Sequence, residues 1–161
     1  MKILLGIVAT VSSLVWSVTA NAQLVEKTTL TLDGAKRIAA AAEQTAKAQS
    51  ARVVIAVVDD GGNLLFLERL DDSQVASVNV GIDKARTAAI YRRPSKVFEE
   101  QVKNGRVSAL ALHGAVALQG GVPITIHGNV IGAIGVSGET PEIDEGIAVA
   151  GAAVAASFAA P

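Results

Sequence analysis

Apolar residues recur along this chain at two spacings, which predict an ordered series of helices and strands. The segment Leu32–Gln49 has helical spacing, and Thr31 or Asp33 can cap it. A second helical pattern covers Ser77–Tyr91 and ends before Pro94, because the residue preceding a proline avoids helical geometry. Its apolar face carries Val78, Ile82, Ala85 and Ala89, and its outer face is predicted to carry Asp83, Lys84, Arg86 and Thr87.

The first strand signals lie between these two helices. Val53–Val58 is a continuous, mostly β-branched apolar run, which is typical of a strand buried on both faces. Residues 59–63 form a turn, and Leu64–Arg69 returns as the second strand of a hairpin. Ser108–Leu118 is ambiguous between helix and strand, and we predict its second half as a strand.

The last part of the chain predicts a second hairpin and a final helix. Residues 120–139, "GGVPITIHGNVIGAIGVSGE", form two strands with Gly128-Asn129 at the turn. Thr140-Pro141-Glu142 starts the helix, because threonine caps well and proline suits the first helical position. Pro94–Lys103 is a short helix or a loop. The short connections between strands indicate an α+β domain in which helices pack on one antiparallel sheet.

The first 22 residues are typical of a secretory signal peptide. Lys2 supplies a positive start, Ile3–Val18 is an apolar run, and Ala20-Asn21-Ala22 provides a cleavage site. The alternative is a membrane anchor, but the run is short and no positive stop-transfer flank follows it. We expect residues 23–161 to form a single exported domain without a membrane segment, either periplasmic or secreted.

Charge and composition narrow the functional classes. The chain has 14 basic and 15 acidic residues and is 3% aromatic, so it offers no basic surface or stacking platform for a nucleic acid. It contains no cysteine, which excludes disulfides, thiolate metal sites and cysteine nucleophiles. An exported chain without disulfides relies on its core or on association with copies of itself.

Glycine interrupts the last two predicted strands, where it weakens strand packing. Two interpretations are open. In one, a helix backbone lies close against the sheet and the glycines give it room. In the other, the bare surface is the floor of a pocket for a flat ligand, shaped by Gly120, Gly121, Gly132 and Gly135.

Four side chains are candidates for binding such a ligand. His113 and His127 are the two histidines, and either can approach the iron of a haem, or serve as an ordinary polar residue. Lys84 and Arg86 can bind a carboxylate or a propionate, or form a solvated face with nearby aspartates.

Two glutamates of the last helix are candidates for a metal site. Glu142 and Glu145 are three residues apart on one helix face, where they can ligate iron or another hard cation. The alternative is that they complement the partial positive charge at the helix start. Motifs of a nucleophile elbow, a zinc protease or a phosphate-binding loop are absent from the sequence.

Four segments together resemble the GlcG/HbpS family: "VVIAVVDDGGNLLFLERLDD", "KARTAAIYRRPS", "GGVPITIHGNVIGAIGVSG" and "DEGIAVAGA". This family also includes the C-terminal domain of PduO-type proteins, and the resemblance covers nearly all of residues 30–156. It implies a two-layer α+β fold with a five-stranded antiparallel sheet. It also implies assembly into homo-oligomers, commonly hexamers or octamers.

The resemblance implies haem binding for some members, partnership with a redox-sensing kinase for others, and roles in glycolate or propanediol metabolism. Our first hypothesis is an exported, oligomeric haem- or tetrapyrrole-binding protein in which His113 or His127 approaches the iron. The second is an enzyme or accessory protein acting on a small carboxylic acid or carbonyl compound, with Asp59, Lys84 or Glu145 transferring protons. The third is a structural or signalling subunit.

Overall fold

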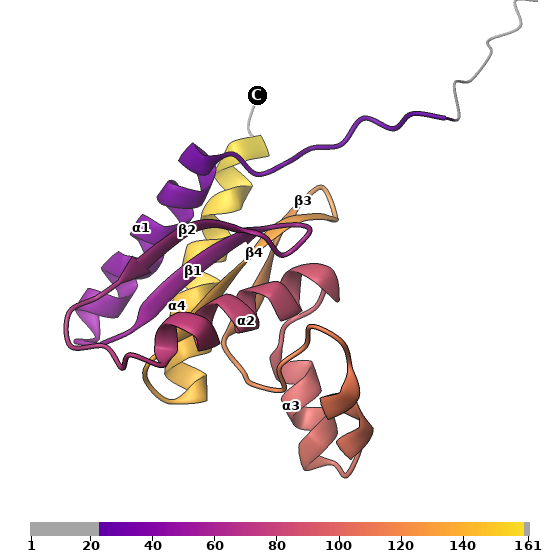
Figure 1. Ribbon diagram of the computed structural model, residues 1–161. Coiled ribbons are helices and arrows are strands. Elements are labelled where there is room, and N and C mark those ends of the chain that lie inside the picture. The colour runs from indigo at the N-terminus through magenta and orange to yellow at the C-terminus, as the bar shows by residue number, and fades with distance from the viewer. Residues whose placement is uncertain (1–22, 160–161) are drawn as a thin grey trace, which may run out of the picture.

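A four-stranded antiparallel sheet in the order β2-β1-β4-β3 forms the centre of the molecule (Figure 1). This computed structural model describes residues 23–159. Its elements are α1 (Leu32–Ala48), β1 (Val54–Asp59), β2 (Leu64–Arg69), α2 (Ser77–Ile90), α3 (Lys96–Lys103), η1 (Val107–Ala111), β3 (Gly121–Ile126), β4 (Asn129–Ser137), α4 (Pro141–Ala153) and η2 (Val154–Ala159). None of the helices in this part of the chain has the length and apolar character that crossing a bilayer requires. The predicted signal peptide, residues 1–22, lies outside the described residues.

Helices cover both faces of the sheet. Ile134 and Gly135 are neighbours on β4, so they face opposite sides. Ile134 lies against Gly151 of α4, whereas Gly135 lies against Gly81 of α2. Because α1 packs beside α4, the domain has three layers: α1 with α4, then the sheet, then α2 (Figure 1). The two-layer arrangement that the resemblance implied is therefore wrong.

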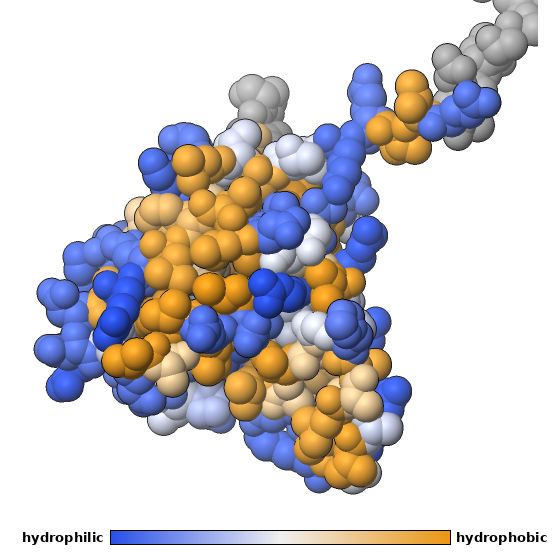
Figure 2. All heavy atoms as spheres, viewed as in Figure 1, coloured by the Kyte–Doolittle hydropathy of each residue, from blue (hydrophilic) through white to orange (hydrophobic). Residues whose placement is uncertain are grey.

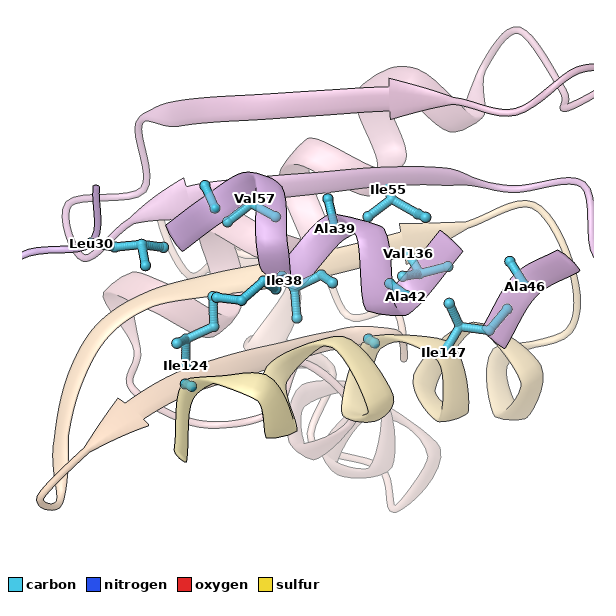
Figure 3. Packing of buried hydrophobic residues seen from close by; sticks show 14 of the residues in the cluster. Leu30, Ile38, Ala39, Ala42, Ala46, Ile55, Val57, Ile124, Val136 and Ile147 are labelled. Carbon is cyan, nitrogen blue, oxygen red and sulfur yellow. The ribbon is translucent and has the colours of Figure 1, made fainter. Parts of the chain in front are cut away.

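The larger core lies between the sheet and the α1–α4 pair (Figure 3). Ala39 and Ala42 of α1, Ile147 of α4, Ile55 of β1 and Val136 of β4 are fully buried there. Alanines let the α1 backbone approach the sheet closely, and the branched side chains fill the remaining space. Burying one valine or isoleucine side chain contributes about 1.5–3 kcal/mol.

Both helices of this core begin where the sequence predicts. Thr31 Oγ1 accepts a hydrogen bond from the Gly34 N–H at 3.1 Å at the start of α1. Thr140 Oγ1 accepts one from the Ile143 N–H at 3.4 Å at the start of α4. Pro141 occupies the first turn of α4, where a missing N–H leaves no hydrogen bond unmade.

The expectation of five strands is wrong: the sheet formed by residues 23–159 has four. The predicted strand in the second half of Ser108–Leu118 does not form, and this segment continues from η1 as irregular chain. Side-chain hydroxyls bind its backbone in place of a neighbouring strand. The Val116 N–H donates to Thr87 Oγ1 at 2.9 Å, and Ser95 Oγ donates to the Leu118 carbonyl at 2.6 Å.

The turn of the second hairpin lies one residue earlier than predicted. β3 ends at Ile126 and β4 begins at Asn129, so His127 and Gly128 form the turn. Both have positive φ, 49° and 78°. A two-residue turn with positive φ at both positions matches the twist of the flanking strands. This places a histidine at the tip of the hairpin.

Candidate functional site

The glycines of β3 and β4 lie against a helix of the same chain. A Cβ atom at Gly135 would stand 2.1 Å from the Gly81 carbonyl oxygen, and one at Gly121 would stand 2.1 Å from the Lys84 carbonyl oxygen. Both oxygens belong to the backbone of α2, which could make room only by lifting off the sheet. Close helix packing, the first of the two interpretations, accounts for the bare surface at these positions.

Gly120 and Gly132 also face atoms of the protein. A Cβ atom at Gly132 would stand 2.5 Å from the Val58 carbonyl oxygen, and one at Gly120 would stand 2.8 Å from Lys84 Nζ. Gly120 also has a φ of 122°, which side chains rarely adopt. The described chain fills the space beside all four glycines, and their role as a ligand floor stays a prediction.

Lys84 is buried, so its predicted place on the outer face of α2 is wrong. It is 5% exposed and shares the buried face of the helix with Gly81 and Ala85. Its Nζ donates to Asp144 Oδ2 at 2.8 Å and to the Val136 carbonyl at 2.9 Å. An ammonium group is rarely buried without a partner, and here α4 supplies that partner.

Asp144 joins α4 to the rest of the domain. The residue is 2% exposed, and its Oδ1 accepts the Glu139 N–H at 3.0 Å. Burial raises the pKa of Asp144, although the Lys84 ammonium and the N–H groups of Glu139 and Gly138 favour the charged form. The Lys84–Asp144 ion pair therefore connects α2 to α4 at the end of β4.

This ion pair opens onto a cavity of about 260 Å³, which we call the Lys84 pocket. The polar side chains that line it include Ser77, Lys84, Glu99, Ser137, Glu139 and Asp144. Pockets that enclose drug-sized ligands measure about 300–1,000 Å³, so this one has no room for a porphyrin. A small polar molecule fits its size and its lining.

The predicted cation ligands of α4 lie beside the same region. Glu145 accepts hydrogen bonds from Lys96 Nζ at 2.9 Å and from Gln119 Nε2 at 2.7 Å, whereas Glu142 is exposed in the first turn. The hydrogen bond and charge of Glu145 raise the pKa of Lys96. Among residues 23–159, no group of three histidine, aspartate or glutamate side chains is placed to hold a metal ion. A cation at Glu142 and Glu145 stays a prediction.

A larger pocket of about 450 Å³ lies at the tip of the β3–β4 hairpin, and we call it the His127 pocket. Its lining includes Val25, Lys27, Arg92, Ile126, His127 and Val130. The extended N-terminal segment thus forms one wall, and the turn after α2 contributes another side chain. An adjacent hollow of about 390 Å³ shares Thr28 and Ile126 with this pocket, so the two lie side by side.

Two side chains of the His127 pocket come from unusual backbone positions. His127 and Arg92 have φ values of 49° and 54°, in the left-handed region that residues other than glycine seldom adopt. Such a conformation costs about 1–3 kcal/mol and often marks a functional position. His127, Arg92 and Lys27 are all exposed residues that line the pocket. Lys27 also pairs with Asp60 at 2.5 Å.

The structure does not bring the other predicted residues into this pocket. His113 is exposed, and its carbonyl accepts a hydrogen bond from the Tyr91 hydroxyl at 2.8 Å. Arg86 pairs with Asp83 on the same helix at 2.9 Å. Asp59 accepts N–H groups within the β1–β2 turn. Their functional roles, including proton transfer by Asp59, stay predictions.

The sequence of this chain matches a known protein family. Residues 30–153 match the family described as "Haem degrading protein HbpS-like". The chain belongs to the HbpS-like family. Protein GlcG of Escherichia coli (strain K12) is 44% identical to this HbpS-like chain over 111 residues, which cover 69% of this chain and 83% of GlcG.

Solved structures agree with this assignment. A double mutant of HbpS from Streptomyces reticuli superposes with a TM-score of 0.76 at 31% identity, covering 92% of this chain and 98% of that one. A structure described as the PduOC:Heme complex superposes with a TM-score of 0.71 at 25% identity, covering 78% and 94%. The predicted family is therefore confirmed, together with its α+β fold.

Sequence reasoning missed three residues of these pockets in the HbpS-like chain. Asp144 precedes the buried Ile147 by three residues, a helical spacing that places it on the buried face of α4. The spacing between Asp144 and Ile147 in the sequence therefore already indicates that Asp144 is buried. Lys27 and Arg92 carry no such signal, because only the folded chain brings the N-terminal segment and the turn after α2 to one hairpin tip.

Proposed function

We propose that this HbpS-like protein binds haem or a related tetrapyrrole in the His127 pocket. The observation that carries the proposal is an imidazole at a hairpin tip beside aliphatic walls and two cationic side chains, with Glu26 and Asp60 in the same lining. Imidazole is a common axial ligand of haem iron, and lysine or arginine pairs with carboxylates such as the haem propionates. The relative crystallised as a heme complex supports the same ligand class.

Each residue has a distinct role in this proposal. His127 would ligate the iron, and Ile126 and Val130 would contact the ring. Arg92 would pair with a propionate, and Lys27 would do so by exchanging its bond with Asp60. When bound, haem supplies an iron centre for redox chemistry or for binding small molecules. The adjoining hollow gives the ring room beyond the 450 Å³ of the pocket itself. This arrangement suits a protein that senses or handles haem or redox state.

The proposal includes assembly into a homo-oligomer, a hexamer or octamer, in the periplasm or outside the cell. His127 is exposed, so one copy covers only one side of a bound ring. Apolar residues gather on the exposed surface at the lower end of the molecule in Figure 2. The exposed apolar side chains of the molecule include Val107 at 65% and Leu110 at 62%, both in η1. A second copy would cover such surfaces. Native mass spectrometry of protein from its own host reports subunit number and retained ligand together.

The haem proposal is tested by titrating hemin into the mature chain and into two histidine variants. His127→Asn removes the imidazole and keeps a residue that tolerates the left-handed turn. His113→Asn is the matched control, because that histidine is also exposed but its carbonyl, not its ring, makes the recorded contact. Hemin should produce a Soret band in the wild type and an unchanged band in His113→Asn.

In His127→Asn, the Soret band should shift and the affinity should fall at least about tenfold, a loss of 1.4 kcal/mol or more. A His127→Asn spectrum and affinity equal to those of the wild type would remove His127 as the ligand. An absence of any Soret change in the wild type would overturn haem binding itself.

A further inference from the structure

The Lys84 pocket holds polar groups that the described chain leaves without partners. Lys84 Nζ has three N–H groups, of which two bind Asp144 and the Val136 carbonyl. Ser77 and Ser137 are 4% and 6% exposed. Every buried side-chain nitrogen and oxygen of residues 23–159 has a hydrogen-bond partner, so the two serine hydroxyls, which bind no other side chain or backbone group there, are the atoms that reach solvent through the pocket. One ammonium N–H and two hydroxyls therefore remain for a guest in this pocket.

Carboxylates surround these donors and set the charge that a guest can carry. Glu99, Glu139 and Asp144 line the pocket together with a single cation, Lys84. Glu99 Oε2 accepts the Gln119 N–H, and each of the other two also accepts a backbone N–H. Because the lining carries more negative than positive charge, an anionic guest would be repelled. A cationic guest would meet the Lys84 ammonium.

We propose that the Lys84 pocket binds a small uncharged polyol. A hydroxyl group can accept a hydrogen bond from the Lys84 ammonium and donate one to a neighbouring carboxylate, which suits the mixed lining. The two serine hydroxyls can either donate or accept. The volume of about 260 Å³ limits the guest to a few carbon atoms. The linings of this pocket and of the His127 pocket share no residue, so the two sites are separate.

Saturation-transfer-difference NMR tests the proposal on the intact protein, because it detects weak binding of small molecules to large assemblies. The probes are glycerol and erythritol, with acetate as the anionic comparison. At least one polyol should give a saturable signal with a dissociation constant in about the millimolar range, as expected for so small a ligand. Acetate should give none.

Ser137→Ala removes one free hydroxyl with little change in volume and should weaken polyol binding about fivefold, the worth of one hydrogen bond. Ser108→Ala, at an exposed position of η1, is the matched control and should bind as the wild type does. Lys84→Met should abolish the signal where circular dichroism shows that it folds. Hemin titration of Ser137→Ala should match the wild type, which separates this site from the haem proposal.

Two results would overturn the polyol site. One is the absence of a saturable signal from either polyol up to about 100 mM, two decades above millimolar affinity. The other is a signal that Ser137→Ala leaves unchanged.

Discussion

The Lys84 pocket and the His127 pocket place charged side chains in opposite settings. In the first, Lys84 and Asp144 are 5% and 2% exposed and bind each other. In the second, His127 and Arg92 reach the surface from left-handed turns. Buried ionised groups must be paired, so the first set is part of what holds the fold together. The second set is exposed, so we expect it to contribute little to folding.

Breaking the buried ion pair should have the largest effect. Lys84→Met leaves Asp144 buried without its partner and should lower the free energy of unfolding by about 3–5 kcal/mol in urea denaturation. The double variant Lys84→Met/Asp144→Leu should recover much of that loss, because an apolar pair can replace a buried ion pair. A loss below about 1 kcal/mol for the single variant would mean that this ion pair contributes no more than a surface salt bridge does. That result would contradict the contrast between the buried charges and the exposed ones.

The close approach of α2 to the sheet should give the next largest effect. In Gly135→Ala the new Cβ would overlap the Gly81 carbonyl oxygen, and the free energy of unfolding should fall by about 3 kcal/mol. Gly146→Ala is the control, since open space surrounds that position on α4, and it should stabilise the protein by about 0.5–1 kcal/mol. Equal effects of the two substitutions, measured by thermal or urea unfolding, would argue against close packing at Gly135.

Asp144 and Asp59 should respond to pH in opposite directions. Burial raises the pKa of Asp144, so the folded chain keeps this proton above pH 3.8, where the unfolded chain has lost it. The contribution of Asp144 to stability therefore falls as pH rises from 3.8 to its higher folded pKa.

Asp59 has a lowered pKa. Its partial burial acts to raise that pKa, but the N–H groups of Asn63 and Gly61 that it accepts outweigh the burial. Its contribution is present above pH 3.8 and is lost as pH falls through the lower folded pKa.

The measurement is the difference in unfolding free energy between the wild type and Asp144→Asn or Asp59→Asn, from about pH 3 to pH 7. With rising pH, the stability advantage of the wild type over Asp59→Asn should grow. Its advantage over Asp144→Asn should shrink. The same slope for both aspartates would contradict the contrast between a buried and a turn carboxylate.

Replacing the exposed histidine should have the smallest effect on stability. Asparagine suits the left-handed turn at least as well as histidine, so His127→Asn should change the free energy of unfolding by less than about 0.5 kcal/mol. Urea unfolding of the ligand-free protein measures this change. A loss above about 2 kcal/mol would mean that the His127 ring supports the fold, contrary to its exposure.

The sequence predicted most of the helices and strands, because their signals are local. Thr31 and Thr140 cap helices as expected, and the β-branched run around Ile55 forms the central strand. Local signals failed where tertiary contacts decide the structure. The segment before Gly120 has the composition of a strand, but hydroxyls of Ser95 and Thr87 bind its backbone instead.

The candidate sites were predicted less completely than the fold. His127 was identified because it is one of two histidines, but its place in a turn depends on the hairpin register. Lys84 was assigned to the wrong face of its helix, although Gly81 and Ala88, three and four residues away, already marked the buried side. Arg92 and Lys27 meet His127 only through the folded chain, and no spacing in the sequence predicts that meeting.

Hydrogen–deuterium exchange of the purified protein, with and without hemin, tests the central claim most directly. The account predicts slower exchange at the hairpin tip around His127 and in the turn that holds Arg92, with no change at the start of α2 around Ser77. Protection at the start of α2, with none at the hairpin tip, would contradict it and move the haem to the other pocket region.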